Sequence, residues 1–152
     1  MTTEIAKPEE ISAFTIRQEI EIAAPIEIAF QSMLDELGPE GLGPNDQSLS
    51  MKLEAWPGGR WYRDLGNNSG HLWGHVQVIK PPTLLEIIGP MPMSYASVNH
   101  VQYRLKSEGA VTRLTFVHSA MGLFLPAHRE GMPEGWQHWL NRIRETAERK
   151  NR

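Results

Sequence analysis

The sequence of 152 residues contains no cysteine. This absence excludes disulfide bonds, thiolate metal ligands and a cysteine nucleophile, and it fits a reducing compartment. The sequence also lacks a run of about 18 apolar residues, which is the length that a membrane-spanning helix needs. Its beginning, MTTEIAKPEEIS, carries charges and a proline where a secretory signal would be apolar. We therefore expect a cytoplasmic protein without a membrane span.

The sequence also has no excess of positive charge, because 15 Lys and Arg residues stand against 18 Asp and Glu residues and the formal net charge is -3. Basic residues gather only near the C-terminus, over 142–152, where Glu145 and Glu148 alternate with them. Such mixing of signs is typical of a solvated helix face and gives no concentrated field for phosphate backbones. We expect no nucleic-acid partner.

Two histidines, His71 and His75, have the H-x-x-x-H spacing that binds zinc from a helix. The surrounding Gly74, Val76 and Val78 favour a strand, in which the two Cα atoms stand about 13 Å apart. Because zinc–nitrogen bonds are about 2 Å long, this pair does not share an ion. Phosphate-binding loops, dinucleotide fingerprints and G-x-S-x-G elbows are missing too. We expect neither a metal nor another cofactor.

The hydrophobic periodicity predicts the order strand, helix, six strands, helix. FTIRQEIEI (14–22) alternates apolar and polar residues, and PIEIAFQSMLDEL (25–37) has helical spacing. Further strands are predicted over 48–56, 60–64, 71–80, 84–88, 97–108 and 110–120. MGLFLPAHREGMPE is predicted to be a loop that leads into a final helix over 134–149. Residues 1–13 are predicted to form a flexible lead-in, and residues 14–152 a single ligand-binding domain.

The final helix carries one continuous apolar stripe at three- and four-residue spacing. The stripe consists of Trp136, Trp139, Leu140, Ile143 and Ala147. Hairpin-length connections between the strands imply an antiparallel sheet, against which this stripe must lie. The fold class is therefore α+β. A bent sheet and a single helix leave a gap between them, which predicts an apolar cavity.

Strand parity and helix spacing select nine candidate ligand-binding residues. They are Met51, Leu53, Trp61, Tyr103, Phe116, His118, Trp136, Trp139 and Leu140. Among these, His118 shares its face with Leu114 and Phe116 and places a polar group in an apolar wall. Three interpretations are open: a hydrogen bond to a loop carbonyl or side chain, contact with a ligand, or general-base catalysis.

Over 71–80, Leu72, Val76 and Val78 look like the core set, which favours an outward orientation of Trp73 and His75. The sequence alone leaves open whether these two side chains face the cavity or the outer surface. An exposed tryptophan in such a row suggests cover by a second subunit. A homodimer through this face is therefore a hypothesis.

Several motifs resemble a known superfamily. WPGGRWYRD, GHVQVIKPPTLLEI, TRLTFVHSAMG and GWQHWLNRI occur in the order found in the SRPBCC, or START-like, proteins. Within that superfamily the chain is most similar to the family named after the C-terminal domain of the activator of the ninety-kilodalton heat-shock protein ATPase. The resemblance covers residues 14–147 and implies a helix-grip, birch-pollen-allergen-like fold, with a seven-stranded sheet around the last helix over a hydrophobic cavity. The HLWGH and GPMPMSY stretches are not family-wide and are candidates for ligand-specific features.

The favoured function is the binding of a small hydrophobic molecule or lipid in this cavity, oriented by His118 and Tyr103. The family name suggests an alternative, a chaperone activator or stress-related interaction protein. Enzymes elsewhere in the superfamily suggest another, a cyclase or dehydratase with His118 as its base.

Overall fold

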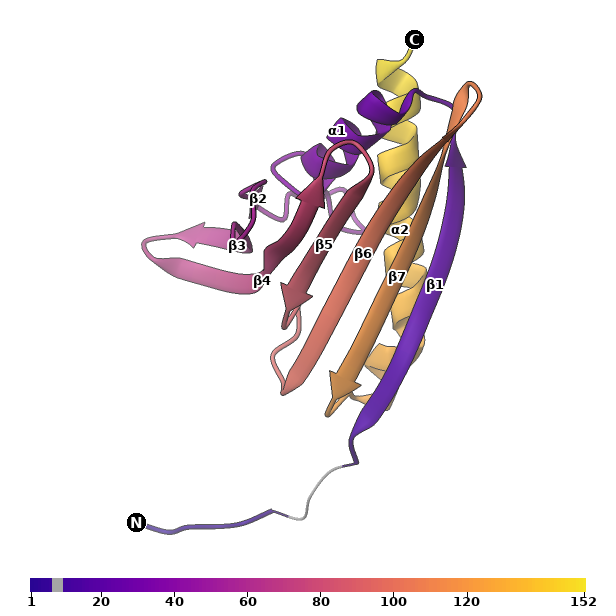
Figure 1. Ribbon diagram of the computed structural model, residues 1–152. Coiled ribbons are helices and arrows are strands. Elements are labelled where there is room, and N and C mark those ends of the chain that lie inside the picture. Colours follow the sequence, from indigo (N-terminus) through magenta and orange to yellow (C-terminus); the bar gives the residue numbers. More distant parts are fainter. Residues whose placement is uncertain (7–9) are drawn as a thin grey trace.

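The computed structural model describes residues 1–6 and 10–152 and contains seven strands and two helices (Figure 1). The elements are β1 (Ser12–Ile22), α1 (Ile26–Glu36), β2 (Met51–Leu53), β3 (Arg60–Gly66), β4 (Ser69–Lys80), β5 (Leu84–Gly89), β6 (Ser97–Glu108), β7 (Val111–Gly122) and α2 (Pro126–Lys150). Residues 7–9 of the predicted lead-in lie outside the described residues, and β1 begins at Ser12. None of the helices in the described ranges is long and apolar enough to cross a membrane.

The strands form one antiparallel sheet in the order β1-β7-β6-β5-β4-β3-β2. From β2 to β7 each strand pairs with its successor, because short connections favour antiparallel neighbours. β1 returns to the free edge of β7, with Ser12 opposite Gly122 and Ile22 opposite Thr112. The predicted order of elements and the α+β helix-grip class are confirmed.

Helix α2 runs along one face of the sheet, and α1 packs beside its C-terminal half (Figure 1). The buried side of α2 includes Trp136, Leu140, Ile143 and Ala147, as its apolar stripe predicts. A carboxylate secures the junction of the helices: Glu36 of α1 accepts hydrogen bonds from Arg142 and Thr146 of α2, at 3.1 and 2.8 Å. The first half of α2 therefore extends beyond α1 along the sheet.

The predicted loop before this helix is wrong, because α2 begins at Pro126 rather than at 134. Proline suits the first turn, where its missing N–H would have no intrahelical partner. Pro133 lies inside the helix but is exposed, so the hydrogen bond that its ring removes is lost on the solvent side. The prolines and glycines of this stretch are typical of loops, and for this reason the sequence did not predict the first two turns of the helix.

The predicted strand over 48–56 is reduced to Met51–Leu53. Ser50 has a φ of 50°, a left-handed conformation that interrupts an extended chain. After the strand, the Glu54 carboxylate accepts 2.8 Å hydrogen bonds from both the backbone N–H and the guanidinium of Arg60. The chain therefore leaves the sheet on both sides of a short strand.

The outward orientation favoured for Trp73 is also wrong. Trp61 pairs with Gly74 and Tyr62 pairs with Leu72, so Trp73 is an extra residue that forms a β-bulge in β4. The bulge shifts the parity of the strand, which leaves Leu72 48% exposed and Trp73 only 4% exposed. The face proposed for a homodimer therefore lacks the tryptophan that motivated it.

Close contact between β4 and β5 fixes the start of the 90–96 loop. A Cβ on Gly89 would lie 2.5 Å from the Gly74 Cα, so a side chain there would force the two strands apart. Directly after this contact, the Met91 N–H donates to the Trp73 carbonyl at 2.8 Å. The first residues of the loop are thereby anchored to β4.

Candidate functional site

Most of the predicted ligand-binding residues are part of the packed core. The Tyr103 and Phe116 rings lie 5.1 Å apart, and Phe116 lies 4.8 Å from the Trp136 ring, measured between centroids. The Trp61 indole donates to the Leu37 carbonyl at 2.8 Å. Six of the nine residues pack in or against this core: Met51, Leu53, Trp61, Tyr103, Phe116 and Leu140. Side chains, rather than a cavity, occupy the space beside them.

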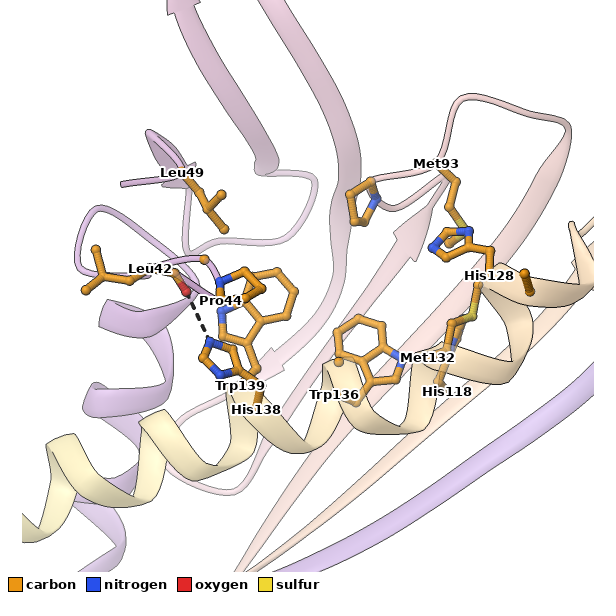
Figure 2. Close-up of a pocket in the computed structure, with 15 residues that line it drawn as sticks. Leu42, Pro44, Leu49, Met93, His118, His128, Met132, Trp136, His138 and Trp139 are labelled. Atoms are coloured by element: carbon orange, nitrogen blue, oxygen red, sulfur yellow. Dashed lines mark hydrogen bonds between the residues drawn. The ribbon is translucent and has the colours of Figure 1, made fainter. Parts of the chain in front are cut away.

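The other three predicted residues, His118, Trp136 and Trp139, line a pocket of about 330 Å³ (Figure 2). We call this space the α2 pocket. Its walls are the first half of α2, the 42–49 loop and the 90–96 loop, with His118 contributed by β7. The lining residues are Leu42, Gly43, Pro44, Leu49, Pro92, Met93, His118, Ala127, His128, Gly131, Met132, Gly135, Trp136, His138 and Trp139. Among these lining residues in the described chain, none is Asp, Glu, Lys or Arg.

Twelve of these residues were missed by sequence reasoning, and half of the twelve lie on α2. For Ala127, His128, Gly131 and Met132 the reason is the incorrect loop over 121–134, because a residue outside a helix has no predicted face. Gly135 and His138 lie in the predicted helix but outside its apolar stripe. A helical signal was nevertheless present, since Ala127, Gly131 and Gly135 recur at intervals of four. The 90–96 loop contributes Pro92 and Met93, which belong to the GPMPMSY stretch singled out from the sequence.

The HLWGH stretch does not reach the α2 pocket. Trp73 packs on Trp61 in the core, with 5.1 Å between ring centroids. His71, Leu72 and His75 are exposed on β4. In the described part of the chain, no group of three histidine or acidic residues is arranged to hold a metal ion.

Two indoles form the aromatic surface of the α2 pocket. Trp136 and Trp139 lie 5.7 Å apart between ring centroids, at an interplanar angle of 28°. Trp139 is supported by Trp61, at 5.9 Å. Figure 2 shows both indoles rising from α2 toward the two loops. Rigid rings with fixed neighbours present a preformed surface to a flat apolar molecule.

A buried hydrogen-bond chain fixes the Trp136 ring. The Trp136 N–H donates to His118 Nδ1 at 3.0 Å, and His118 Nε2 lies 2.7 Å from Asn99 Oδ1. The Asn99 amide nitrogen donates to the carbonyls of Gly89 and Pro90, so its oxygen is the atom that accepts from His118. His118 is therefore the neutral tautomer with its proton on Nε2.

Burial lowers the pKa of His118 to about 4. A protonated ring would also direct an N–H at the Trp136 N–H, so geometry and desolvation favour the same neutral form. Both ring nitrogens are engaged by protein side chains, and neither is left to take a proton from a substrate. The geometry thus assigns His118 a positioning role toward Trp136.

Two further histidines lie at the ends of the α2 pocket. His128 Nδ1 lies 2.6 Å from the hydroxyl of Tyr95 in the 90–96 loop. At the other end, His138 Nε2 contacts the Leu42 carbonyl at 3.4 Å. Burial raises the pKa of Tyr95, whose hydroxyl therefore stays protonated. Each histidine connects α2 to one of the two loops.

Comparison with known families identifies the chain. Residues 47–148 match the model of the family described as Activator of Hsp90 ATPase homolog 1-like protein. The chain belongs to this family. The resemblance inferred from the sequence motifs is thus confirmed for the segment from just before β2 to the end of α2.

Several solved structures share the fold of this chain. A Rhizobium leguminosarum protein is 19% identical with a TM-score of 0.74, over 94% of this chain and 99% of its own. CalU16 from Micromonospora echinospora is 18% identical with a TM-score of 0.62, over 94% and 87% of the two chains. The Aha1 dimer from Colwellia psychrerythraea is 18% identical with a TM-score of 0.62, over 89% and 96%. No curated protein matches the sequence.

Proposed function

We propose that this protein binds a small, largely apolar organic molecule in the α2 pocket. The supporting observation is the lining: two rigid indoles, aliphatic and thioether side chains, and no acidic, lysine or arginine side chain among the described residues that form it. The volume of about 330 Å³ lies within the range of small-molecule sites. Removal of apolar surface from water is the driving force for such binding.

Two glycines on α2 make this proposal testable without removing any contact. A Cβ added at Gly131 or Gly135 would meet nothing within 4 Å, and both residues line the α2 pocket. Leucine is also a better helix former than glycine. Gly131→Leu and Gly135→Leu should therefore fill the pocket while the fold is retained.

The experiment is a titration of tryptophan fluorescence with a panel of hydrophobic compounds. The unmodified protein should bind at least one compound saturably, and the two leucine variants should lose that binding at unchanged or higher Tm. Gly135→Ala is the matched control, because its single methyl group leaves most of the volume open. Equal affinity of the leucine variants and the unmodified protein would place the compound elsewhere and refute the proposal.

Family membership supports a second candidate function, the activation of an Hsp90-type chaperone ATPase. Activation of a chaperone requires contact between two protein surfaces, so we do not expect it to depend on the interior of the α2 pocket. The chaperone ATPase rate, measured with and without this protein, separates the two candidates. Stimulation that persists in Gly131→Leu would assign the activity to a surface independent of the pocket.

A further inference from the structure

We propose that the ligand of the α2 pocket carries one uncharged hydrogen-bond acceptor, and that His128 Nε2–H binds this acceptor. The inference rests on the proposed function and specifies the ligand further: a flat apolar body, with a carbonyl or ether oxygen at one end. His128 would then determine which end of the molecule faces the 90–96 loop.

The placement of His128 is the first observation. Its Nδ1 is taken by the Tyr95 hydroxyl at 2.6 Å, and no hydrogen bond within residues 1–6 and 10–152 uses its Nε2. Figure 2 shows the imidazole at the Met93 side of the α2 pocket, on the same side of α2 as Trp136. His128 is exposed, so one ring nitrogen is held by Tyr95 and the other is open to solvent or to a bound molecule.

The surroundings of Tyr95 hold its ring beside His128. The phenol ring is fixed edge-on to Phe124, with 5.5 Å between centroids, and its centroid lies 5.8 Å from that of His128. We assign the hydroxyl as the donor in this bond. An imidazole that accepts at Nδ1 carries its proton on Nε2. His128 thus presents an N–H to the pocket, and an N–H requires an acceptor.

The other polar side-chain atoms of the lining are either hydrogen-bonded within the protein or buried, so they offer few hydrogen-bonding partners to a ligand. His118 uses both nitrogens within the protein, and the Trp136 N–H donates to it. The Trp139 Nε1 atom has no hydrogen-bond partner among the described residues but is buried, so a ligand does not reach it without a movement of the ring. His138 contacts the Leu42 carbonyl at the far end. No Asp, Glu, Lys or Arg is among the described lining residues, so a charged ligand group would gain no counter-charge from these side-chain types. An uncharged acceptor at one end matches this arrangement.

Three naphthalenes of nearly equal shape test the proposal. The ketone 2-acetylnaphthalene has a carbonyl oxygen where 2-isopropenylnaphthalene has a methylene group, and 2-naphthoate carries a full negative charge. A single neutral hydrogen bond predicts that the ketone binds about three- to tenfold more tightly than the hydrocarbon. The ketone should also bind more tightly than the carboxylate.

The variants attribute this preference to one side chain. His128→Phe should bind both neutral compounds with equal affinity, whereas Tyr95→Phe should reduce the preference by freeing the imidazole. His75→Phe is the matched control, because His75 is exposed on β4 away from the pocket, and it should keep the full preference.

Three results would overturn the inference while leaving the proposed function intact. They are equal binding of ketone and hydrocarbon to the unmodified protein, a preference that survives in His128→Phe, and tightest binding of the carboxylate. A failure of all three naphthalenes to bind the unmodified protein at their solubility limits would count against the proposed function itself and would remove the inference with it.

Discussion

The buried neutral form of His118 predicts a specific dependence of stability on pH. Its pKa falls from 6.5 to about 4 on folding, because the charged imidazole would be desolvated. Between these two pH values the unfolded chain takes up a proton that the folded chain does not. The stability that His118 contributes is therefore complete above pH 6.5 and is lost as the pH falls toward 4.

The magnitude follows from the two pKa values. At about 1.4 kcal/mol per pH unit, the whole interval corresponds to a loss of about 3 kcal/mol in the free energy of unfolding. For a domain of this size such a loss is a large fraction of the total stability. The protonated ring also opposes the Trp136 N–H, so the same acidification should release the indole that lines the α2 pocket.

The assay is urea unfolding of the unmodified protein and of His118→Gln at pH 7.5, 6.5, 5.5 and 4.5. Glutamine keeps one donor and one acceptor but carries no charge at any of these pH values. We expect the difference in unfolding free energy between the two proteins to shrink by about 2–3 kcal/mol from pH 7.5 to 4.5. A difference that stays constant across this range would refute the assignment of a buried neutral His118.

Three substitutions test other parts of the fold by urea unfolding. Gly135→Ala should stabilise the protein by about 0.5–1 kcal/mol, because the methyl group meets no neighbour and alanine is the better helix former; destabilisation would show that the position is crowded. Trp61→Phe should cost about 1 kcal/mol more than Trp73→Phe, because only the Trp61 N–H has a hydrogen-bond partner, and equal costs would contradict this. Glu36→Ala should cost about 1.5–3 kcal/mol by removing the buried acceptor of Arg142 and Thr146, so a loss below 1 kcal/mol would show that these hydrogen bonds are dispensable.

The strands illustrate why sequence periodicity succeeded over most of the sheet. β6 matches its predicted limits of 97–108, because Asn99, Val101, Tyr103 and Leu105 alternate without interruption. β4 violates the same rule at Trp73, where one unpaired residue shifts the parity. A bulge depends on how the partner strand pairs, and the sequence of β4 alone does not contain that information.

The candidate site was harder to predict than the fold. Tyr103 and Phe116 do face inward as their parity indicates, but neighbouring rings cover them, and they line no wall of the α2 pocket. His128 lies in a stretch rich in proline and glycine, where helical periodicity is weak and a loop was predicted. Its partner Tyr95 lies 33 residues away along the chain, so no local pattern connects them.

The sequence by itself determined the order of elements, the antiparallel sheet, the apolar side of α2 and the family, because alternation and helical spacing are local properties of the chain. Only the tertiary structure decided where the open space lies, which nitrogens are already engaged and which tryptophans remain accessible. These properties depend on how distant side chains fill or leave a volume, and packing is a relation between segments that no single segment encodes.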